Sequence, residues 1–443
     1  MKIIQLREQL DEHFTLGSEE KDALLSYLKD GQGYIRTMPR GKEESELCLS
    51  ITRKESDIIV NSSYFIGVDW ISESELAVQV SPKLNDDKNG VEIDYVRMLN
   101  EALRDKENFD HLQDLIEINF KSPSIPIKQH QDSLSILLVT EYLNILHRLV
   151  KKGLRKSYFT VQNNLKNKIK GRIITSKNVQ KNLTKGNITN NYCSYQVYDI
   201  DSPENRILKR ALLFCIRQIN SYAHSKALET SFLEGKVRFI KPYFTNVSDD
   251  VDIRTIQNCK GNPVFKEYYQ AIKYAQLLLK RYSYDITAIG KESIATPPFW
   301  IDMSKLFELY VFAKLREVYT AEGEIKYHVK AHYQELDYLL KPKCFKEPYV
   351  IDAKYKPRYK ENGGISMDDA RQVSGYARLS SIYKGLGLLD QIDELPPIKC
   401  LIIYPDQEAT NHFTFTRETE PSFEKVNGYV RMYKVGIKLP VIE

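Results

Sequence analysis

Two short runs, residues 335–340 and 349–355, constrain this chain most, because apolar and polar residues alternate in both. Such alternation is typical of β-strands, and the turn between them, rich in lysine and proline, predicts a hairpin. Asp337 lies in the first run, and Asp352 and Lys354 lie in the second. Side chains two residues apart on a strand point to one face, so Asp352 and Lys354 are expected side by side. The second run is apolar enough for a covered strand, which rarely carries two charges without a partner or a metal.

These residue types suit phosphodiester chemistry. Asp337 and Asp352, brought together from adjacent strands, would offer Mg²⁺ hard oxygen ligands and leave positions open for water and phosphate. The ammonium group of Lys354 would then position or help deprotonate the attacking water. The alternative is a hairpin that carries ordinary solvated charges.

The flanking segments favour the metal site. Residues 303–319 predict an amphipathic helix that contains Glu308. Residues 369–379 also have a helical pattern, with Gln372 and Tyr376 one turn apart, and a further strand is expected at 399–404. The order helix, strand, strand with Asp-x-Lys, helix, strand is that of the PD-(D/E)xK restriction-endonuclease-like core.

The chain resembles McrC, the nuclease subunit of McrBC-type modified-DNA (5-methylcytosine) restriction systems. The matching segments in the last third are PFWIDMSKLFELYV (298–311), Asp337, IDAKYK (351–356), the Asp369, Gln372 and Tyr376 run, and LIIYP (401–405). The resemblance implies that Asp337 and Asp352 are Mg²⁺ ligands, that Lys354 is the catalytic lysine, and that Glu308, Gln372 and Tyr376 are supporting residues. One departure is Leu336, which stands where the motif has proline.

The N-terminal region, residues 1–120, reads as a β-rich domain. A helix is expected at 18–29 and another at 93–103, and short strands are expected at 46–52, 57–61, 64–70 and 75–81. Their spacing predicts a compact barrel or sandwich. The segments YFIGVDWI (64–71) and LAVQVSPKL (76–84) also resemble McrC, which implies that this domain docks into a hexamer of an McrB-like AAA+ GTPase. Arg36, Arg40 and Lys83 are candidate contacts, with ordinary surface charge as the alternative for each.

The middle region, residues 121–285, is expected to be a mostly helical domain and holds a strongly basic tract. From Tyr142 to Tyr198 there is no Asp or Glu but there are twelve Lys or Arg residues, whereas the whole chain carries only +5. Tyr158 and Phe159 are interleaved with these cations, a combination that suits the phosphate backbone of DNA. The candidate DNA-binding residues are Lys151, Lys152, Arg155, Lys156, Lys168, Lys170 and Arg172. The alternative is that the tract meets an acidic surface of a partner.

Other patterns limit the function. No phosphate-binding GxxxxGK[ST] loop occurs, so any GTP would be bound by the partner. Six scattered cysteines, a charged N-terminus and the lack of a long apolar run predict a cytoplasmic protein without disulfides or a membrane span. His328 and His332 are interpreted as structural or surface residues.

The sequence therefore predicts an α+β multidomain protein with a β-rich N-terminal domain, a helical middle domain and a nuclease domain at 286–443. We expect a Mg²⁺-dependent endodeoxyribonuclease, a hydrolase of an antiviral restriction system, whose cleavage a partner GTPase controls and which stimulates that GTPase in turn. Two alternatives stay open: a stand-alone RecB-like repair or defence nuclease, and a non-catalytic activator of a AAA+ ring. The modified base, the number of metal ions and the oligomeric state are left undetermined.

Overall fold

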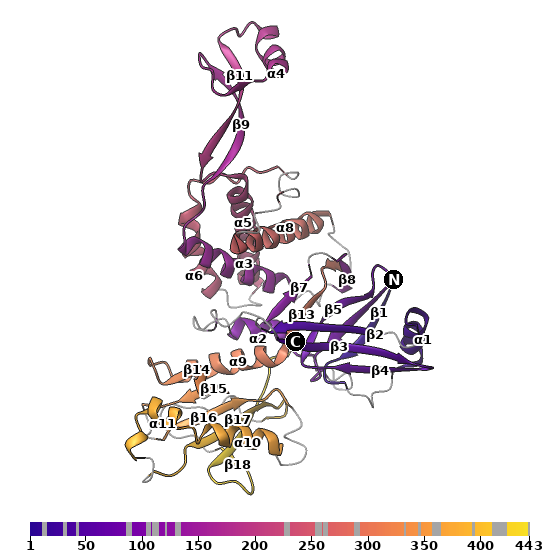
Figure 1. Ribbon diagram of the computed structural model, residues 1–443, viewed down its shortest axis with the longest axis vertical. Helices are drawn as coiled ribbons and strands as arrows, with labels where there is room; N and C mark the ends of the chain where they lie inside the picture. Colours follow the sequence, from indigo (N-terminus) through magenta and orange to yellow (C-terminus); the bar gives the residue numbers. More distant parts are fainter. Residues whose placement is uncertain are drawn as a thin grey trace. The chain divides into compact units, whose positions relative to one another are not determined.

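A computed structural model shows the chain as two compact units, residues 1–127 with 294–443, and residues 128–293 (Figure 1). No helix in the part of the chain that the structure describes is both long and apolar enough to cross a membrane. The described residues are 1–10, 16–29, 33–40, 44–85, 91–102, 108, 115–119, 122–128, 134–225, 231–252, 259, 265–287, 293–331, 334–343, 347–356, 365–391, 395–409 and 423–441.

The first unit contains two sheets at its N-terminal end. The larger has five strands in the order β1-β6-β5-β13-β7, formed by β1 (Lys2–Arg7), β6 (Leu76–Ser81), β5 (Phe65–Ser72), β13 (Phe299–Asp302) and β7 (Ile116–Ile118). The smaller is an antiparallel meander of β2 (Gly33–Arg40), β3 (Glu44–Lys54) and β4 (Asp57–Ser62). Helices α1 (Ser18–Tyr27) and α2 (Tyr95–Ala102) complete this part.

These two sheets share one apolar core. Inward residues of the meander, such as Ile51 and Val60, pack in the same cluster as Val78 of β6 and Leu24 of α1. Burying both inner faces removes a large apolar area from water, which is what holds two sheets together. Of the two arrangements expected from the sequence, a barrel or a sandwich, two sheets that share one core agree better with a sandwich.

Strand β13 joins distant parts of the chain. Its four residues are fully buried and pair antiparallel with β5 on one side and β7 on the other. Trp300 of β13 lies in the shared core, with its indole nitrogen 3.1 Å from Asp69 Oδ2. The regions 1–120 and 286–443, predicted as separate domains, thus belong to one unit, because residues after 285 complete the N-terminal sheet.

The C-terminal part is a six-stranded mixed sheet with helices on both faces. Its strand order is β14-β15-β16-β17-β19-β18, formed by β14 (Ile325–Ala331), β15 (Gln334–Leu340), β16 (Tyr349–Ala353), β17 (Lys399–Pro405), β19 (Met432–Ile437) and β18 (Glu424–Lys425). On one face, Phe312 of α9 (Met303–Val318) stacks on Tyr338 of β15. On the other face, α10 (Met367–Tyr376) and α11 (Ser380–Leu386) pack in a cluster that includes Leu339 and Val350. The predicted order of helix, two strands, helix and strand is present.

The second unit is a group of helices from which a β-ladder projects (Figure 1). Its helices are α3 (Leu134–Lys151), α5 (Pro203–Ser225), α6 (Ser231–Ile240) and α8 (Lys266–Thr287). The prediction of a mostly helical region is incomplete, because residues 157–199 form β9 (Ser157–Lys166), β10 (Arg172–Ile173) and β11 (Asn190–Asp199), with α4 (Thr175–Lys181) between β10 and β11. Both long strands are rich in aromatic and β-branched residues, which favour extended backbone.

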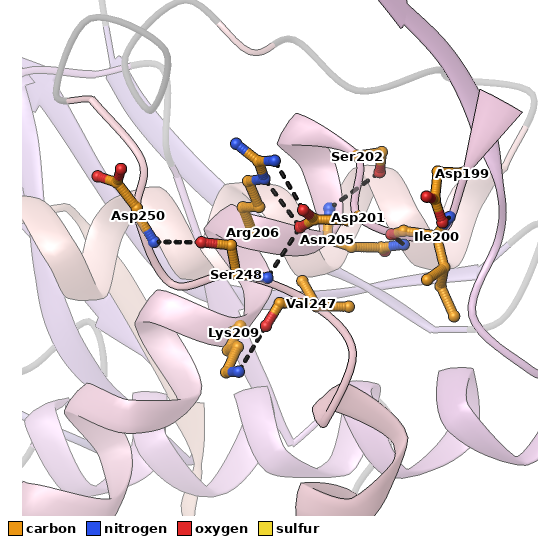
Figure 2. A network of polar contacts seen from close by, with 10 residues as sticks. All are labelled: Asp199, Ile200, Asp201, Ser202, Asn205, Arg206, Lys209, Val247, Ser248 and Asp250. Carbon is orange, nitrogen blue, oxygen red and sulfur yellow. Dashed lines mark hydrogen bonds and ion pairs between the residues drawn. The ribbon is translucent and has the colours of Figure 1, made fainter. Parts of the chain in front are cut away.

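At the base of the ladder, the start of β9 and the end of β11 are both tied to the start of α5. The buried side chain of Asn205 donates to the carbonyl oxygen of Arg155, just before β9, at 2.9 Å and to that of Ile200, just after β11, at 2.7 Å. Asp201 accepts two hydrogen bonds from the Arg206 guanidinium and one from the backbone of Ser248 (Figure 2). The base of the ladder is therefore fixed to the helices by a satisfied polar network.

Candidate active site

The two aspartates meet where β15 and β16 pair. The antiparallel register sets Tyr338 against Ile351, so the next position along the same ladder sets Asp337 against Asp352. Asp337 Oδ2 accepts a hydrogen bond of 2.8 Å from the backbone nitrogen of Ala353. Asp352 is 1% exposed, in a strand whose five residues are all buried. Strand pairing alone brings these carboxylates together, as the sequence predicts.

Lys354 lies directly after β16 and completes the group. Its Nζ is 2.8 Å from Asp352 Oδ2 and donates to Gln372 Oε1 at 3.0 Å. Gln372 in turn donates to the hydroxyl oxygen of Tyr376 at 2.8 Å, one turn further along α10. The structure thus places Asp352, Lys354, Gln372 and Tyr376 in one chain of contacts.

Glu308 reaches the same region from α9. Its Oε2 accepts from the Tyr327 hydroxyl at 3.4 Å and lies 3.4 Å from His328 Nε2, while its backbone oxygen accepts from the Tyr338 hydroxyl at 2.6 Å. These contacts tie α9 to β14 and β15 beside the aspartates. All six residues predicted for the site are therefore gathered around one end of this part of the sheet.

His328 is a neighbour of the site that the sequence interpretation missed. In the β14–β15 register it falls opposite Asp337, between the pairs Tyr327–Tyr338 and Val329–Leu336. Its ring nitrogens lie 3.4 Å from Glu308 and 3.1 Å from Glu335, and its φ of 49° is in the left-handed region. Nothing in the local sequence signals this conformation, and His332 lies outside the described residues.

A second ion pair flanks the lysine. Lys356 Nζ lies 2.9 Å from both carboxylate oxygens of Asp369, which also accepts from the hydroxyl of Ser366, the N-cap of α10. The matching segments 351–356 and 369–376 contained both partners, but their spacing in the sequence does not show that they touch.

Burial and the crowding of negative charge raise the pKa values of the two aspartates. Burial, and then the charges of Asp352 and Glu308, raise the pKa of Asp337 well above its ordinary value. Burial also raises the pKa of Asp352, against the opposing attraction of Lys354. For Lys354, burial acts to lower the pKa, but the attraction and hydrogen bond of Asp352, together with the charges of Asp337 and Asp369, outweigh it and the net pKa is raised. The lysine is therefore a cation, and the two acids gain if a positive charge is supplied between them.

The donor set agrees with a magnesium ion. Among the described residues no group of three or more His, Cys, Asp or Glu side chains could hold a metal, so a site rich in protein ligands is not present. Mg²⁺ usually binds through one or two carboxylates and keeps waters or phosphate oxygens in its other positions. Asp337 and Asp352, whose pKa values are raised chiefly by burial, fit that pattern.

The basic tract divides into two groups. Lys151, Lys152, Arg155 and Lys156 lie at the base of the β9–β11 ladder, where Lys152 pairs with Glu267 at 2.7 Å and Arg155 lies 3.9 Å from the Phe265 ring. Lys168, Lys170 and Arg172 lie at the far end, where Lys170 covers the Tyr195 ring at 4.4 Å. The exposed rings of Tyr158 and Tyr198 contact each other near the base, 4.7 Å between centroids.

The far end of the ladder is also apolar in part. Ile188 is 80% exposed, and Ile169, Leu183 and Val179 are also exposed among the lysines. Exposed aliphatic groups of this kind are more usual on protein-binding than on phosphate-binding surfaces. The seven candidate DNA-binding residues thus fall into two groups, one at each end of β9, and exposed aliphatic side chains accompany the far group.

Fold and site together define a mixed α+β multidomain protein in which the buried Asp352 and the partly buried Asp337 lie beside a lysine. Residues 65–389 match the family described as McrBC 5-methylcytosine restriction system component, and the chain belongs to this family.

Two solved structures from Thermococcus gammatolerans are similar. One is a half-complex from a tetradecameric assembly of McrB AAA+ hexamers with bound McrC, with 13% identity, coverage of 99% of this chain and 94% of that chain, and a TM-score of 0.39. The other is the McrBC complex, with 13% identity, coverage of 71% and 87%, and a TM-score of 0.27. No curated protein matches. The family assignment rests on the match over 65–389.

Proposed function

We propose that this chain is the Mg²⁺-dependent DNA endonuclease subunit of a McrBC-like restriction system, with a PD-(D/E)xK active site. The single observation that supports this most is the cluster in which Asp337 and Asp352 face each other while Lys354 Nζ lies 2.8 Å from Asp352. Membership of the McrBC family supplies the biological setting.

Each residue has a distinct role. Asp337 and Asp352 would hold Mg²⁺, which would lower the pKa of a bound water and offset charge on the phosphate. The cationic Lys354 holds a phosphate oxygen or the attacking water at the open side of the pair. Gln372, itself bonded to Tyr376, directs Lys354 through its 3.0 Å contact, and Glu308 adds negative charge near Asp337.

Control of cleavage belongs to a partner. We propose that an McrB-like AAA+ GTPase hexamer binds the N-terminal sheets, binds GTP and recognises modified cytosine, and that this chain stimulates its GTPase. Arg36 is a poor candidate contact, because it pairs with Asp69 at 3.4 Å and Glu117 at 3.0 Å within the fold. The side chain of Arg40 lies outside the described residues.

Plasmid cleavage tests the active site. Wild type, Asp352→Ala and Lys354→Ala would be assayed with methylated and unmethylated plasmid in Mg²⁺, with and without the GTPase and GTP. We expect each substitution to lower the cleavage rate by about a hundredfold or more, since each removes charge that acts on the reacting phosphate. Asp57→Ala and Lys21→Ala are matched controls, because they break an ion pair of 2.9 Å on the surface.

The outcomes separate the alternatives. Cleavage that needs GTP and the partner and disappears in both variants supports the proposal. Cleavage without any partner indicates a RecB-like nuclease instead. If the variants cut as well as wild type, or if nothing cuts while GTP hydrolysis still rises, the chain is an activator of the ring and the active-site assignment fails.

Duplex binding in increasing salt tests the basic tract. One variant would replace Lys168, Lys170 and Arg172 by glutamine, and another Lys151, Lys152, Arg155 and Lys156. Each lost phosphate contact should lower the slope of log K against log salt by roughly 0.9. A third variant, with exposed Lys54, Lys384 and Lys425 replaced, controls for net charge. If either tract variant matches this control, that group meets the partner protein rather than DNA.

A further inference from the structure

A buried polar cluster connects the N-terminal sheet to the strand that carries Asp352. Glu8, just after β1, is 2% exposed, and Tyr355, just after β16, is 1% exposed. The Tyr355 hydroxyl donates to Glu8 Oε1 at 2.9 Å, and the backbone nitrogen of Lys83 donates to the same oxygen at 2.9 Å. Residues from three distant parts of the sequence therefore meet at one carboxylate oxygen.

Lys83 holds Tyr355 in two further ways. Its Nζ donates to the backbone oxygen of Tyr355 at 2.6 Å and to Gln9 Oε1 at 2.8 Å. The same ammonium lies 4.0 Å from the centre of the Tyr355 ring and 4.6 Å from that of Tyr64. The hydroxyl, the ring and the carbonyl of Tyr355 are thus each held by the N-terminal part of the unit. Lys83, predicted to be a partner contact or an ordinary surface charge, therefore makes contacts within the unit.

Tyr355 is the residue between the two lysines of the candidate active site. On one side Lys354 approaches Asp352 at 2.8 Å, and on the other Lys356 pairs with Asp369 at 2.9 Å. The Lys354 backbone nitrogen donates to the Ile403 oxygen, and that of Lys356 to the Lys354 oxygen. A rotation of the Tyr355 backbone would therefore move both ammonium groups relative to the aspartates.

Packing does not require these polar groups. The Tyr355 ring already contacts Phe307, with 5.7 Å between centroids, and a phenylalanine would keep that contact. Burying Glu8 is costly, since its Oε2 has no hydrogen-bond partner among the described residues and burial raises its pKa. A carboxylate retained at such a cost has a use beyond filling space.

We propose that Glu8, Lys83 and Tyr355 form a positioning cluster that sets the placement of Lys354 and Lys356, so that the N-terminal sheet is part of the catalytic apparatus. This rests on the proposed nuclease function. The cluster touches no reacting atom and acts through the lysines on either side of Tyr355.

Steady-state cleavage by Tyr355→Phe and two Glu8 variants tests this role in the full chain with its GTPase. Tyr355→Phe should lower kcat about tenfold with little change in KM, since small misplacements of catalytic groups cost rate rather than binding. Glu8→Ala should do the same. Glu8→Gln keeps an acceptor oxygen for both donors and should stay within about threefold of wild type.

Tyr142→Phe is the matched control. It removes another fully buried hydroxyl, which donates to the Leu208 oxygen at 2.7 Å in the second unit. If Tyr142→Phe loses as much kcat as Tyr355→Phe, or if Tyr355→Phe changes only Tm, the cluster is merely structural and the proposal is wrong.

Hydrogen exchange separates this proposal from the nuclease assignment. In Tyr355→Phe, amides of a peptide spanning 349–356 should exchange about tenfold faster, while peptides from β3 and α5 stay unchanged. A uniform increase across all peptides, or none at 349–356, would overturn the positioning role. Should wild type fail to cut while the local exchange effect is seen, the nuclease assignment fails and the structural coupling stands.

Discussion

At the scale of single residues, the candidate site concentrates features that disfavour folding. Two aspartates face each other, and burial raises the pKa of each, so that folding disfavours their ionised forms. A histidine with φ of 49° lies opposite one of them. Such costs cluster where chemistry needs a fixed arrangement of charge.

Asp337→Asn should stabilise the fold in a pH-dependent way. Because the pKa of Asp337 is raised on folding, its favourable contribution is full below the ordinary aspartate pKa and is lost as pH rises through the raised value. The amide avoids that loss, so Tm should rise at pH 8 by the equivalent of about 1 kcal/mol, with a smaller gain at pH 4.

Asp57→Asn is the control of opposite sign. Hydrogen bonding from Lys21 lowers the pKa of this exposed carboxylate, so its contribution is present at neutral pH and is lost on acidification. Calorimetry from pH 4 to 8 should show no stabilisation at pH 8. If both variants respond alike, the pKa of Asp337 is not raised.

His328 should tolerate only residues that accept left-handed backbone. His328→Val should cost about 1–2 kcal/mol, because a β-branched side chain clashes at positive φ, whereas His328→Gly and His328→Asn should cost little. Chemical denaturation of the three variants measures this. Equal stability of Val and Gly would mean that the backbone there is extended.

At the scale of elements, the decisive feature is the contact of β5 with β13. A Cβ on Gly67 would lie 2.0 Å from the carbonyl oxygen of Phe299, far inside van der Waals contact and against backbone. Glycine is what allows β13 to enter the N-terminal sheet, and β13 leads directly into α9 and Glu308.

Gly67→Ala should therefore destabilise the first unit by about 3 kcal/mol or more, the scale of severe core overpacking. Gly235→Ala in α6 is the contrast, since nothing lies within 4 Å of its added Cβ and alanine favours helix, so a small gain is expected. Thermal unfolding of both variants measures these changes in stability. A Gly67→Ala variant as stable as wild type would show that β13 is not held against β5.

At the scale of the whole molecule, the chain is divided differently from its linear order. Residues 1–127 and 294–443 form one compact unit. In the sequence, the residues of the second unit, 128–293, are inserted between these two segments. The C-terminal region is bound to the N-terminal one through β13, Trp300 and the positioning cluster.

A truncated chain of residues 286–443 should consequently fail to unfold cooperatively, because β13 would lose both neighbouring strands. A chain in which residues 129–292 are replaced by a short Gly/Ser linker should keep a cooperative transition. Calorimetry of the two shortened chains shows whether each unfolds in a cooperative transition. A cooperative transition in the 286–443 chain would show that this region folds by itself.

Residue spacing alone located much of the local structure and the residues that meet in the candidate site. Strand alternation and helical periodicity located α9, β15, β16, α10 and β17, and with them Asp337, Asp352, Lys354 and Gln372, because contacts along one strand or helix follow from residue spacing. The sequence showed the positive charge of the basic tract. It placed the lysines in a mostly helical region, whereas residues 157–199 form β9, β10, α4 and β11.

Features that depend on long-range pairing became visible only in the folded chain. The insertion of β13 beside Gly67, the left-handed His328 against Asp337, and the contact of Glu8 with Tyr355 join residues that are distant in the chain or shaped by a partner strand. No local pattern encodes such meetings, because their free energy comes from burying surfaces of separate elements together rather than from the preferences of either segment.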